Sequence, residues 1–499
     1  MSNTKAHSTS ENEALGVPGA ARSNEQRLFG SESGRRWLGG IILAYAVLCL
    51  FYNLITPIGE ACDELDHIRY VEHLVRFGSF APVSAGTQMP YSLEAKQPPG
   101  YYLLNAGLML GFGRCGQQLA PELERNPDGP SMGPDAPEVY WFIRTPVPND
   151  LLPWTHLMRL VGLLLGVGTI LLTFATVREV LPSHDHVPLA LGAAAIVGLL
   201  PTFTFVTATV NNDNLVIFVG AAICYWLMRV LARGTTLRDG AILGALLGLG
   251  LLSKMNTLGF IPVVFFVLFA NKLKPRAGAP AQQPNRVAIH LPRGLSTRFL
   301  TVLLALAMCL LIAGWWYARN VLVYGDVFAS AAVREMSNAV IDWHRSTFDP
   351  RAPGAWIIQL FIVLGTHYGA FGCVTVKAPL ILWLLYMAMS LLALAGLVVL
   401  LARRQINATQ ISQVAIAVLT VMLVYSSMVY NAVGQGRLLF PTIAFTSLLA
   451  TVGTYGLISL VGRKMPTRTN AIATAVLWAA FLGGTNIFCL FWVLIPAWY

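Results

Sequence analysis

Long, continuously apolar runs recur along most of this chain, and many of them approach the roughly 20 residues that a helix needs to cross a bilayer. Of its 499 residues, 55% are hydrophobic and only 12% are charged. A soluble protein of this size does not carry so many such runs. The runs are continuous rather than alternating, which excludes a transmembrane β-barrel. The sequence therefore predicts an all-α polytopic membrane protein.

We expect eleven transmembrane helices, at 37–56, 154–178, 187–207, 213–232, 239–253, 257–271, 299–317, 379–402, 411–430, 438–461 and 471–495. Two further apolar segments, 101–112 and 356–371, are ambiguous. The first has only about 12 apolar residues, which is too few to span the bilayer. We interpret both segments as amphipathic helices on the outer surface.

The basic connectors predict the orientation, because Lys and Arg gather in the cytoplasmic loops of membrane proteins. If neither ambiguous segment crosses the membrane, the strongly basic linker 272–298 lies inside, together with the other basic connectors. The N-terminus is then in the cytoplasm and the C-terminus is outside. These connectors account for the net charge of +10, so the charge does not indicate nucleic-acid binding.

The predicted organisation places the large loops on one side of the membrane. Residues 1–36 are mostly polar and indicate a disordered cytoplasmic tail, and 37–495 form the transmembrane domain. Within that domain the outer face carries a first loop, 57–153, and a second loop, 318–378, each with a juxtamembrane helix. No internal repeat is apparent, which weakens the interpretation as a transporter built from inverted repeats.

An acidic cluster follows the first predicted span. Asp63, Glu64, Asp66 and His67 fall within five consecutive positions, in a chain where charge is rare. Carboxylates that close repel one another, so such a cluster serves a cation, a proton transfer or a solvated helix end. The alternative to an active site is an N-terminal cap for a helix that starts near residue 65.

Cationic side chains stand at the outer ends of separate predicted spans. Lys254 and Arg319 end two spans, Arg437 opens another, and Arg159 lies about one turn inside its span, after His156. Each could be an interface anchor. Several of them opposite a carboxylate cluster are better explained by an anionic ligand, and phosphate is the natural candidate.

The seven cysteines show no CxxC spacing and mostly lie in or beside apolar segments. This pattern predicts neither a metal cage nor a disulfide framework. The one pair considered is Cys62 with Cys115, which could form on an oxidising face.

Four motifs resemble the GT-C membrane glycosyltransferases, in particular the bacterial branch related to protein mannosyltransferases and the lipid A aminoarabinose transferase. They are Asp63-Glu64-x-x-His67, the run Lys-Gln-Pro-Pro-Gly-Tyr-Tyr at 96–102, Trp316-x-x-Arg319-Asn320-x-x-x-Tyr324-Gly325-Asp326, and Gln435-Gly436-Arg437-x-x-x-Pro441. The resemblance covers the whole transmembrane part in matching order. The motifs specify the superfamily and not the substrate.

The resemblance implies a polyprenyl-phosphate-linked sugar donor on the outer face, with Asp63 deprotonating or orienting the acceptor hydroxyl. Glu64 and His67 would hold Asp63 or an ion. Asp66 adds a third carboxylate, so either Asp63 or Asp66 could be the base. A divalent cation is possible on Asp63, Glu64 and His67, although the cofactor is unknown. Tyr102 is more consistent with a structural role.

The predicted function is transfer of a sugar, hexosyl or pentosyl, from a polyprenyl-phosphate donor to a glycan, lipid or protein acceptor of the cell envelope. Lys254, Arg319 and Arg437 would bind the donor phosphate, with Asp63 and Glu64 catalytic. The predicted location is the bacterial inner membrane, with the active site facing the periplasm. The alternative is a transporter or flippase of an anionic lipid-linked sugar, which explains the cations but not the one-sided loops.

Overall fold

The structure is a computed structural model, and it describes residues 32–81, 92–123, 149–273, 293–330, 354–372, 374–430 and 435–499. Most of the predicted cytoplasmic tail 1–36, most of the linker 272–298 and part of the second outer loop 318–378 lie outside these ranges.

The described residues form a bundle of long apolar helices, eight of which are long and apolar enough to cross a membrane. Six are single helices: α2 (Glu32–Ile55), α6 (Leu152–Val180), α9 (Asp213–Arg233), α12 (Arg293–Tyr324), α15 (Leu380–Ala402) and α16 (Ala408–Tyr430). Two are composite: η3 (Gly436–Thr442) with α17 (Ile443–Val461), and α18 (Thr467–Phe488) with η4 (Cys489–Leu494) and α19 (Ile495–Trp498). The protein is therefore a multi-pass membrane protein.

The other three predicted spans are also helical, but each is short or broken. The segment 187–207 forms α7 (Val187–Leu199), which continues η1 (His184–His186), and α8 (Pro201–Thr207). The axis of α8 is bent by 61° from that of the continuous helix 184–199. Pro201 cannot donate the backbone hydrogen bond that would continue α7. α10 (Leu237–Leu251) has 15 residues, about 22 Å of helix, and α11 (Ile261–Ala270) follows η2 (Met255–Phe260). The eleven-span topology therefore stays a prediction.

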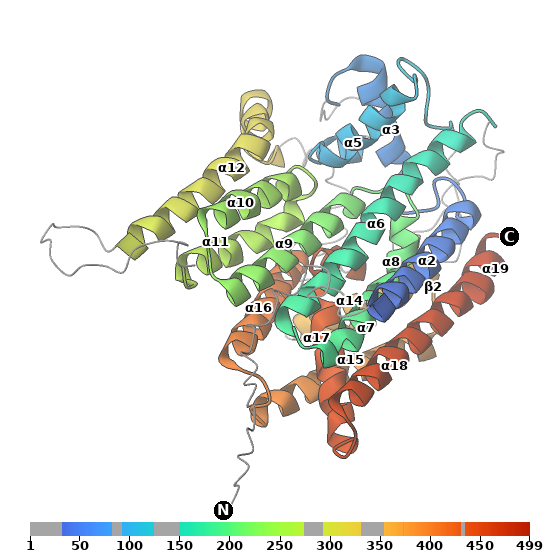
Figure 1. The fold of residues 1–499 in the computed structure, drawn as a ribbon. Coiled ribbons are helices and arrows are strands. Elements are labelled where there is room, and N and C mark those ends of the chain that lie inside the picture. Colours follow the sequence, from blue (N-terminus) through green and yellow to red (C-terminus); the bar gives the residue numbers. More distant parts are fainter. Residues whose placement is uncertain are drawn as a thin grey trace, which may run out of the picture.

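The two polar loops carry shorter helices and a small hairpin. α3 (Glu64–Phe77), α4 (Ser92–Ala95) and α5 (Gly100–Gly111) come from the first loop, and α3 and α5 lie together at the top of Figure 1. α14 (Ala355–Gly369) and the hairpin of β1 (Ala370–Phe371) with β2 (Val376–Lys377) come from the second. The helices expected at 101–112 and 356–371 are confirmed as α5 and α14.

Small residues allow the long helices to pack closely. On α10, Gly240, Gly244 and Gly248 repeat every fourth residue and face α12; a Cβ on Gly244 would lie 2.1 Å from the carbonyl oxygen of Ala305. In a bilayer the lipid tails are as apolar as the side chains, so helix association depends on such close contact. Any larger residue at Gly244 would force α10 and α12 apart.

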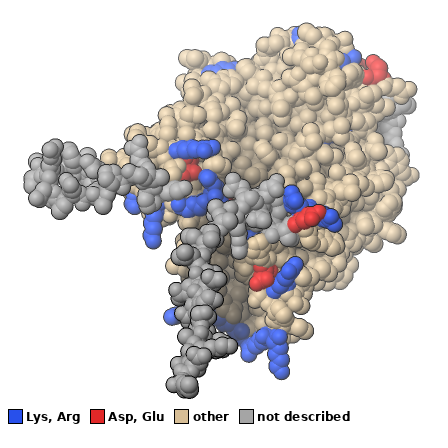
Figure 2. All heavy atoms as spheres, in the orientation of Figure 1, with Lys and Arg blue, Asp and Glu red and all other residues tan. Residues whose placement is uncertain are grey.

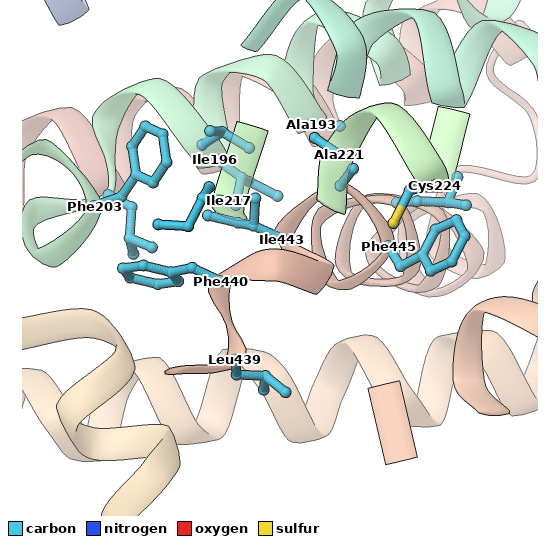
Figure 3. Packing of buried hydrophobic residues seen from close by; sticks show 14 of the residues in the cluster. Ala193, Ile196, Phe203, Ile217, Ala221, Cys224, Leu439, Phe440, Ile443 and Phe445 are labelled. Atoms are coloured by element: carbon cyan, nitrogen blue, oxygen red, sulfur yellow. The ribbon is translucent and has the colours of Figure 1, made fainter. Parts of the chain in front are cut away.

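The start of α17 is anchored in the centre of the bundle. Figure 3 shows Phe440 and Ile443 packed among side chains of α7, α8 and α9. The rings of Phe203 and Phe440 lie 5.9 Å apart. A Cβ on Gly220 would meet the carbonyl oxygen of Pro441 at 2.2 Å, so η3 touches the backbone of α9. This packing fixes the position of Arg437, one turn earlier in η3.

Candidate functional site

Asp63 occupies the N-cap position of α3, as the capping interpretation expects, but its side chain makes no capping hydrogen bond. Its backbone is in the left-handed region, with φ of 59°, which Asp tolerates better than most residues. Its side chain is 38% exposed, and Oδ2 lies 3.6 Å from Nη2 of Arg437. The carboxylate therefore points away from its own helix and toward a cation from η3.

Glu64, the next residue, is fully buried in an ion pair with Arg159 of α6, whose side chain is also 0% exposed. The guanidinium donates two hydrogen bonds, from Nε to Oε1 at 2.8 Å and from Nη2 to Oε2 at 2.7 Å. The amide of Val210 donates to Oε1 at 2.9 Å, and that of Gly59 to Oε2 at 3.3 Å. Both oxygens of Glu64 are thus occupied by protein donors.

Arg159 uses its remaining nitrogen to hold the end of α2. Nη1 donates to the carbonyl oxygens of Asn53 at 2.5 Å and Thr56 at 3.0 Å. A buried charge needs such complete pairing, because desolvation costs several kcal/mol per ion. The Glu64–Arg159 pair therefore ties together α2, α3, α6 and the α8–α9 turn, directly beside Asp63.

Asp213 begins α9 and joins two of the predicted cations. Its carboxylate is buried, with Oδ1 at 2.5 Å from Nζ of Lys254 and Oδ2 at 3.7 Å from Nη1 of Arg437. Lys254 also donates to Oδ1 of Asn212 at 3.2 Å. Arg437 bridges Asp213 and Asp63. Four side chains from distant parts of the sequence therefore form a row of alternating charges, in the order Lys254, Asp213, Arg437 and Asp63.

Lys254 and Arg437 therefore converge next to Asp63, as the sequence predicts, whereas Arg319 does not join them. The Arg319 guanidinium lies over three aromatic rings, 4.9 Å from the ring centre of Trp316 and 5.6 Å from those of Phe80 and Tyr324. It also donates to Oδ1 of Asn320 at 3.4 Å. Arg319 lies among these rings because α12 continues to Tyr324 instead of ending near 317, so that Arg319 belongs to the last turns of the helix.

A buried hydrogen-bond network lies one turn further along α3 than Asp63, at His67. The hydroxyl of Tyr102 donates to Oε2 of Glu94 at 3.1 Å and lies 2.9 Å from Nδ1 of His67. Burial is the main cause that lowers the pKa of His67, to about 4, and that raises the pKa of Glu94. The charges of Asp63, Lys254, Asp213 and Arg437 also act on the pKa of His67. His67 is therefore neutral at physiological pH.

Glu94 is a residue that the sequence analysis did not single out, although it lies two positions before the Lys-Gln-Pro-Pro run. Asp213 lies in the run of polar residues 211–214 between two predicted spans, a pattern that is typical of a tight interhelical turn. A signal was present for Asp213, a carboxylate at the end of an apolar segment, but not for Glu94, which lies in a polar stretch. Tyr102, the nearer partner of Glu94, is only eight residues away, but His67 of α3 and the partners of Asp213 are distant in sequence.

Asp66 lies one turn along α3 and pairs with Arg69 at 3.3 Å. Burial raises the pKa of Asp66 to about 6, Arg69 lowers it, and the neighbouring charge of Asp63 raises it further. Asp66 and Asp63 therefore influence each other electrostatically, but Asp66 has its own cation and Asp63 faces Arg437.

The residues proposed for a divalent cation do not form a ligand set. No group of three His, Cys, Asp or Glu side chains that could hold a metal occurs within the described ranges. Glu64 is saturated by Arg159 and two amides, and His67 faces Tyr102. The sequence left Asp63, Glu64 and His67 open as a cation site because they are close in the chain. Glu64 and His67 do share a face of α3, but Arg159 and Tyr102 already occupy their polar atoms.

The sequence predicts no disulfide framework and leaves open a Cys62–Cys115 pair; in the structure Cys62 is disulfide-bonded. Cys115 is a free, exposed thiol and is therefore not its partner. Cysteine spacing cannot reveal which side chains meet in space, and this pairing depends on tertiary structure. The disulfide is directly next to Asp63 in the chain.

A cavity opens beside Arg437 and Cys62, with about 360 Å³ of empty space when its opening is included. Polar side chains from α8, α14 and the segment before α17 line it, among them Thr202, Thr366 and Gln435. Two buried polar atoms in the adjacent turn, Nδ2 of Asn212 and Oδ2 of Asp213, have no hydrogen-bond partner. The charged cluster therefore borders a polar space and retains hydrogen-bonding capacity.

Residues 155–279 match the family model described as dolichyl-phosphate-mannose-protein mannosyltransferase. For this segment, the resemblance to mannosyltransferase-related glycosyltransferases is confirmed. The segment contains Arg159, Asp213 and Lys254. No curated protein matches the chain in sequence.

Several solved structures of glycosyltransferases are similar to the chain. The Archaeoglobus fulgidus oligosaccharyltransferase AglB, in complex with an inhibitory peptide and a dolichol-phosphate, matches with a TM-score of 0.49 and 12% identity, over 91% of this chain and 56% of that one. ArnT from Cupriavidus metallidurans, bound to undecaprenyl phosphate, matches with a TM-score of 0.48 and 13% identity, over 94% of this chain and 74% of that one. The Saccharomyces cerevisiae Pmt1–Pmt2 complex, bound to the sugar donor, matches with a TM-score of 0.38 and 15% identity, over 65% of this chain and 37% of that one. The chain thus spans little more than half the length of the archaeal enzyme.

Proposed function

We propose that this protein is a membrane glycosyltransferase that moves a sugar, hexosyl or pentosyl, from a polyprenyl-phosphate donor to a glycan, lipid or protein acceptor of the cell envelope. The observation that carries the proposal is the position of Asp63. It is a half-exposed carboxylate held outside its own helix, beside two cations at the end of a transmembrane bundle. The family match over 155–279 supports the same reaction class.

Asp63 is the group that would act on the acceptor. A hydroxyl is a weak nucleophile, and a carboxylate within hydrogen-bond reach accelerates its attack by accepting its proton. In the proposed step the acceptor oxygen bonds to the anomeric carbon, Asp63 takes the hydroxyl proton, and the bond from that carbon to the phosphate oxygen breaks. The polyprenyl phosphate leaves with the bonding electrons.

Lys254 and Arg437 would stabilise the departing phosphate. Both side chains remain partly exposed, at 15% and 14%, while Asp213 between them is only 2% exposed. Preorganised cations at the site of developing charge lower the barrier of such a step. In this arrangement Asp213 is a positioning residue that holds the two cations, and Glu64 positions Asp63 through its pair with Arg159.

We propose that the site faces the periplasm of a bacterial inner membrane. The disulfide at Cys62 supports an oxidising compartment on the side of Asp63. Figure 2 shows Lys and Arg side chains more densely in the middle and lower parts of this face than at the top, where α3 and α5 lie in Figure 1. This distribution supports a cytoplasmic location for the opposite end of the bundle.

The test uses the purified full-length protein in proteoliposomes with a panel of polyprenyl-phosphate sugars and an envelope extract as acceptor source. Asp63→Asn keeps the shape of the side chain but removes the base, and should lower sugar transfer roughly 10²- to 10⁴-fold with unchanged insertion. Asp66→Asn is the matched control and should retain most activity. The reverse ranking would show that Asp66 is the base. Donor translocation without transfer in the wild type would contradict the enzyme proposal.

A further inference from the structure

A second cavity lies far from Asp63, in a groove between α2 and α18 with α7 as its floor. It encloses about 1510 Å³ of empty space, its opening to the surroundings included. α7 packs against both flanking helices. The groove is open to the surroundings of the bundle, because Trp37 on one lip is 67% exposed and Val476 on the other is 59% exposed.

The walls of the groove are apolar over almost their whole length. Small residues on the three helices, including Gly40, Ala44, Ala195 and Ala479, keep it wide. The polar side chains that line it are Ser33, His184 and Arg468. All three stand at the same end, because each belongs to the first residues of α2, η1 or α18. The groove is therefore amphipathic along its axis.

Its length corresponds to one leaflet of a bilayer. The lining residues run from 33 to 44 on α2, from 187 to 199 on α7 and from 468 to 479 on α18. At 1.5 Å per residue, each stretch measures about 16–18 Å. Half of the hydrocarbon core of a bilayer is about 15 Å. One acyl chain fits this length, whereas a polyprenyl chain of many units would extend well beyond it.

The charge at the polar end favours an anion. Arg468 is exposed there, and basic residues outnumber acidic ones around it. Among the described residues of these helix ends and turns, the basic ones are Arg35, Arg36, Arg178, Arg463, Lys464 and Arg468, and the acidic ones are Glu32, Glu179 and Asp185. Glu32 is already paired with Arg36 at 2.7 Å. Basic pockets between transmembrane helices bind the headgroups of anionic lipids.

We propose that this groove binds an anionic glycerophospholipid of the leaflet opposite Asp63, with one acyl chain between α2 and α18 and the phosphate at Arg468. The bound lipid fills the space that α7 leaves between the two outer helices. The site is independent of the candidate active site and requires nothing of the proposed glycosyl transfer.

The experiment measures lipid retention by native mass spectrometry of the full-length protein, after equilibration with phosphatidylglycerol or phosphatidylcholine of identical acyl chains. Arg468→Gln should lower the preference for phosphatidylglycerol about fivefold, as expected for one basic residue near a lipid phosphate. Arg463→Gln, which is near the same end but does not line the groove, is the matched charge control.

A steric pair of variants tests the acyl chain separately. A Cβ on Gly40 or on Gly39 would meet nothing within 4 Å, so both positions accept a larger residue. Only Gly40 lines the groove. Gly40→Leu should reduce retention of both lipids several-fold, and Gly39→Leu should not.

Three results would overturn the proposal: equal retention of the two lipids by the wild type, equal effects of Arg468→Gln and Arg463→Gln, or equal effects of Gly40→Leu and Gly39→Leu. A photo-cross-linker attached through Gly40→Cys gives an independent measurement. Capture of phosphatidylglycerol would support the proposal. Capture of residues 1–31 of this chain instead would assign the groove to the N-terminal segment and overturn it.

Discussion

The substitution Glu64→Gln should destabilise this protein far more than its conservative chemistry suggests. The amide retains the volume of the side chain and can still accept from the amide of Val210. It cannot balance the charge of Arg159, which is 0% exposed and loses its carboxylate partner. Removing one member of a buried ion pair costs about 3–5 kcal/mol, because the other charge remains buried without compensation.

The chain offers a matched control in the pair Arg36–Glu32, in which the two side chains are 78% and 68% exposed. Arg36→Gln should cost less than about 1 kcal/mol, since water screens an exposed pair. The double variant Glu64→Gln/Arg159→Met removes both buried charges. It should be less destabilised than the sum of the two single variants by roughly 2 kcal/mol or more, because neither charge is left alone.

The assay is equilibrium unfolding in mixed micelles titrated with a denaturing detergent. A loss of 3 kcal/mol lowers the folding equilibrium constant by about two orders of magnitude, well outside experimental scatter. If Glu64→Gln costs no more than Arg36→Gln, or if the single variants add in the double variant, the Glu64–Arg159 pair does not tie α3 to the bundle. The positioning role inferred for Glu64 would then be wrong.

Three further predictions follow from other parts of the molecule. Gly244→Leu should prevent close packing of α10 on α12 and destabilise the fold, whereas Gly107→Leu should not, since a Cβ there would meet nothing within 4 Å; thermal unfolding of both variants measures this. Because burial lowers the pKa of His67 to about 4, the unfolded chain binds the proton more readily, and about 3 kcal/mol of stability should be lost as pH falls from about 6.5 to about 4. Unfolding of His67→Gln should lack this component, and an unchanged pH profile in that variant would contradict the assignment. A compartment-specific reporter fused within 272–298 should be active only in the cytoplasm, and periplasmic activity would refute the eleven-span topology.

Much of the architecture could be predicted from the sequence because its physical cause is local. Burial of backbone polar groups in lipid requires helices, and about 20 apolar residues in a row are sufficient to indicate one. Every apolar segment expected as a span is helical, as are the two ambiguous segments at 101–112 and 356–371. The sequence predicts each span as one straight, membrane-crossing helix, whereas α7–α8 is bent and α10 is short.

The composition of the site was only partly predictable, for a reason that the ion pairs make plain. Asp63, Lys254 and Arg437 stand out in the sequence as rare charges beside apolar runs, so their importance could be inferred one residue at a time. Their partners could not. Asp213 meets Lys254 across 41 residues of chain.

Glu64 shows the same limit more sharply. In sequence it is the neighbour of Asp63 and resembles a second acid, but Arg159, 95 residues away, occupies both of its oxygens. Sequence alone determined that these helices form and that rare charges lie at their ends, because hydropathy acts through residues that are close in the chain. Tertiary structure decided which charges are paired and buried and which one stays half-exposed. That distinction depends on distances between segments that only the packed bundle sets.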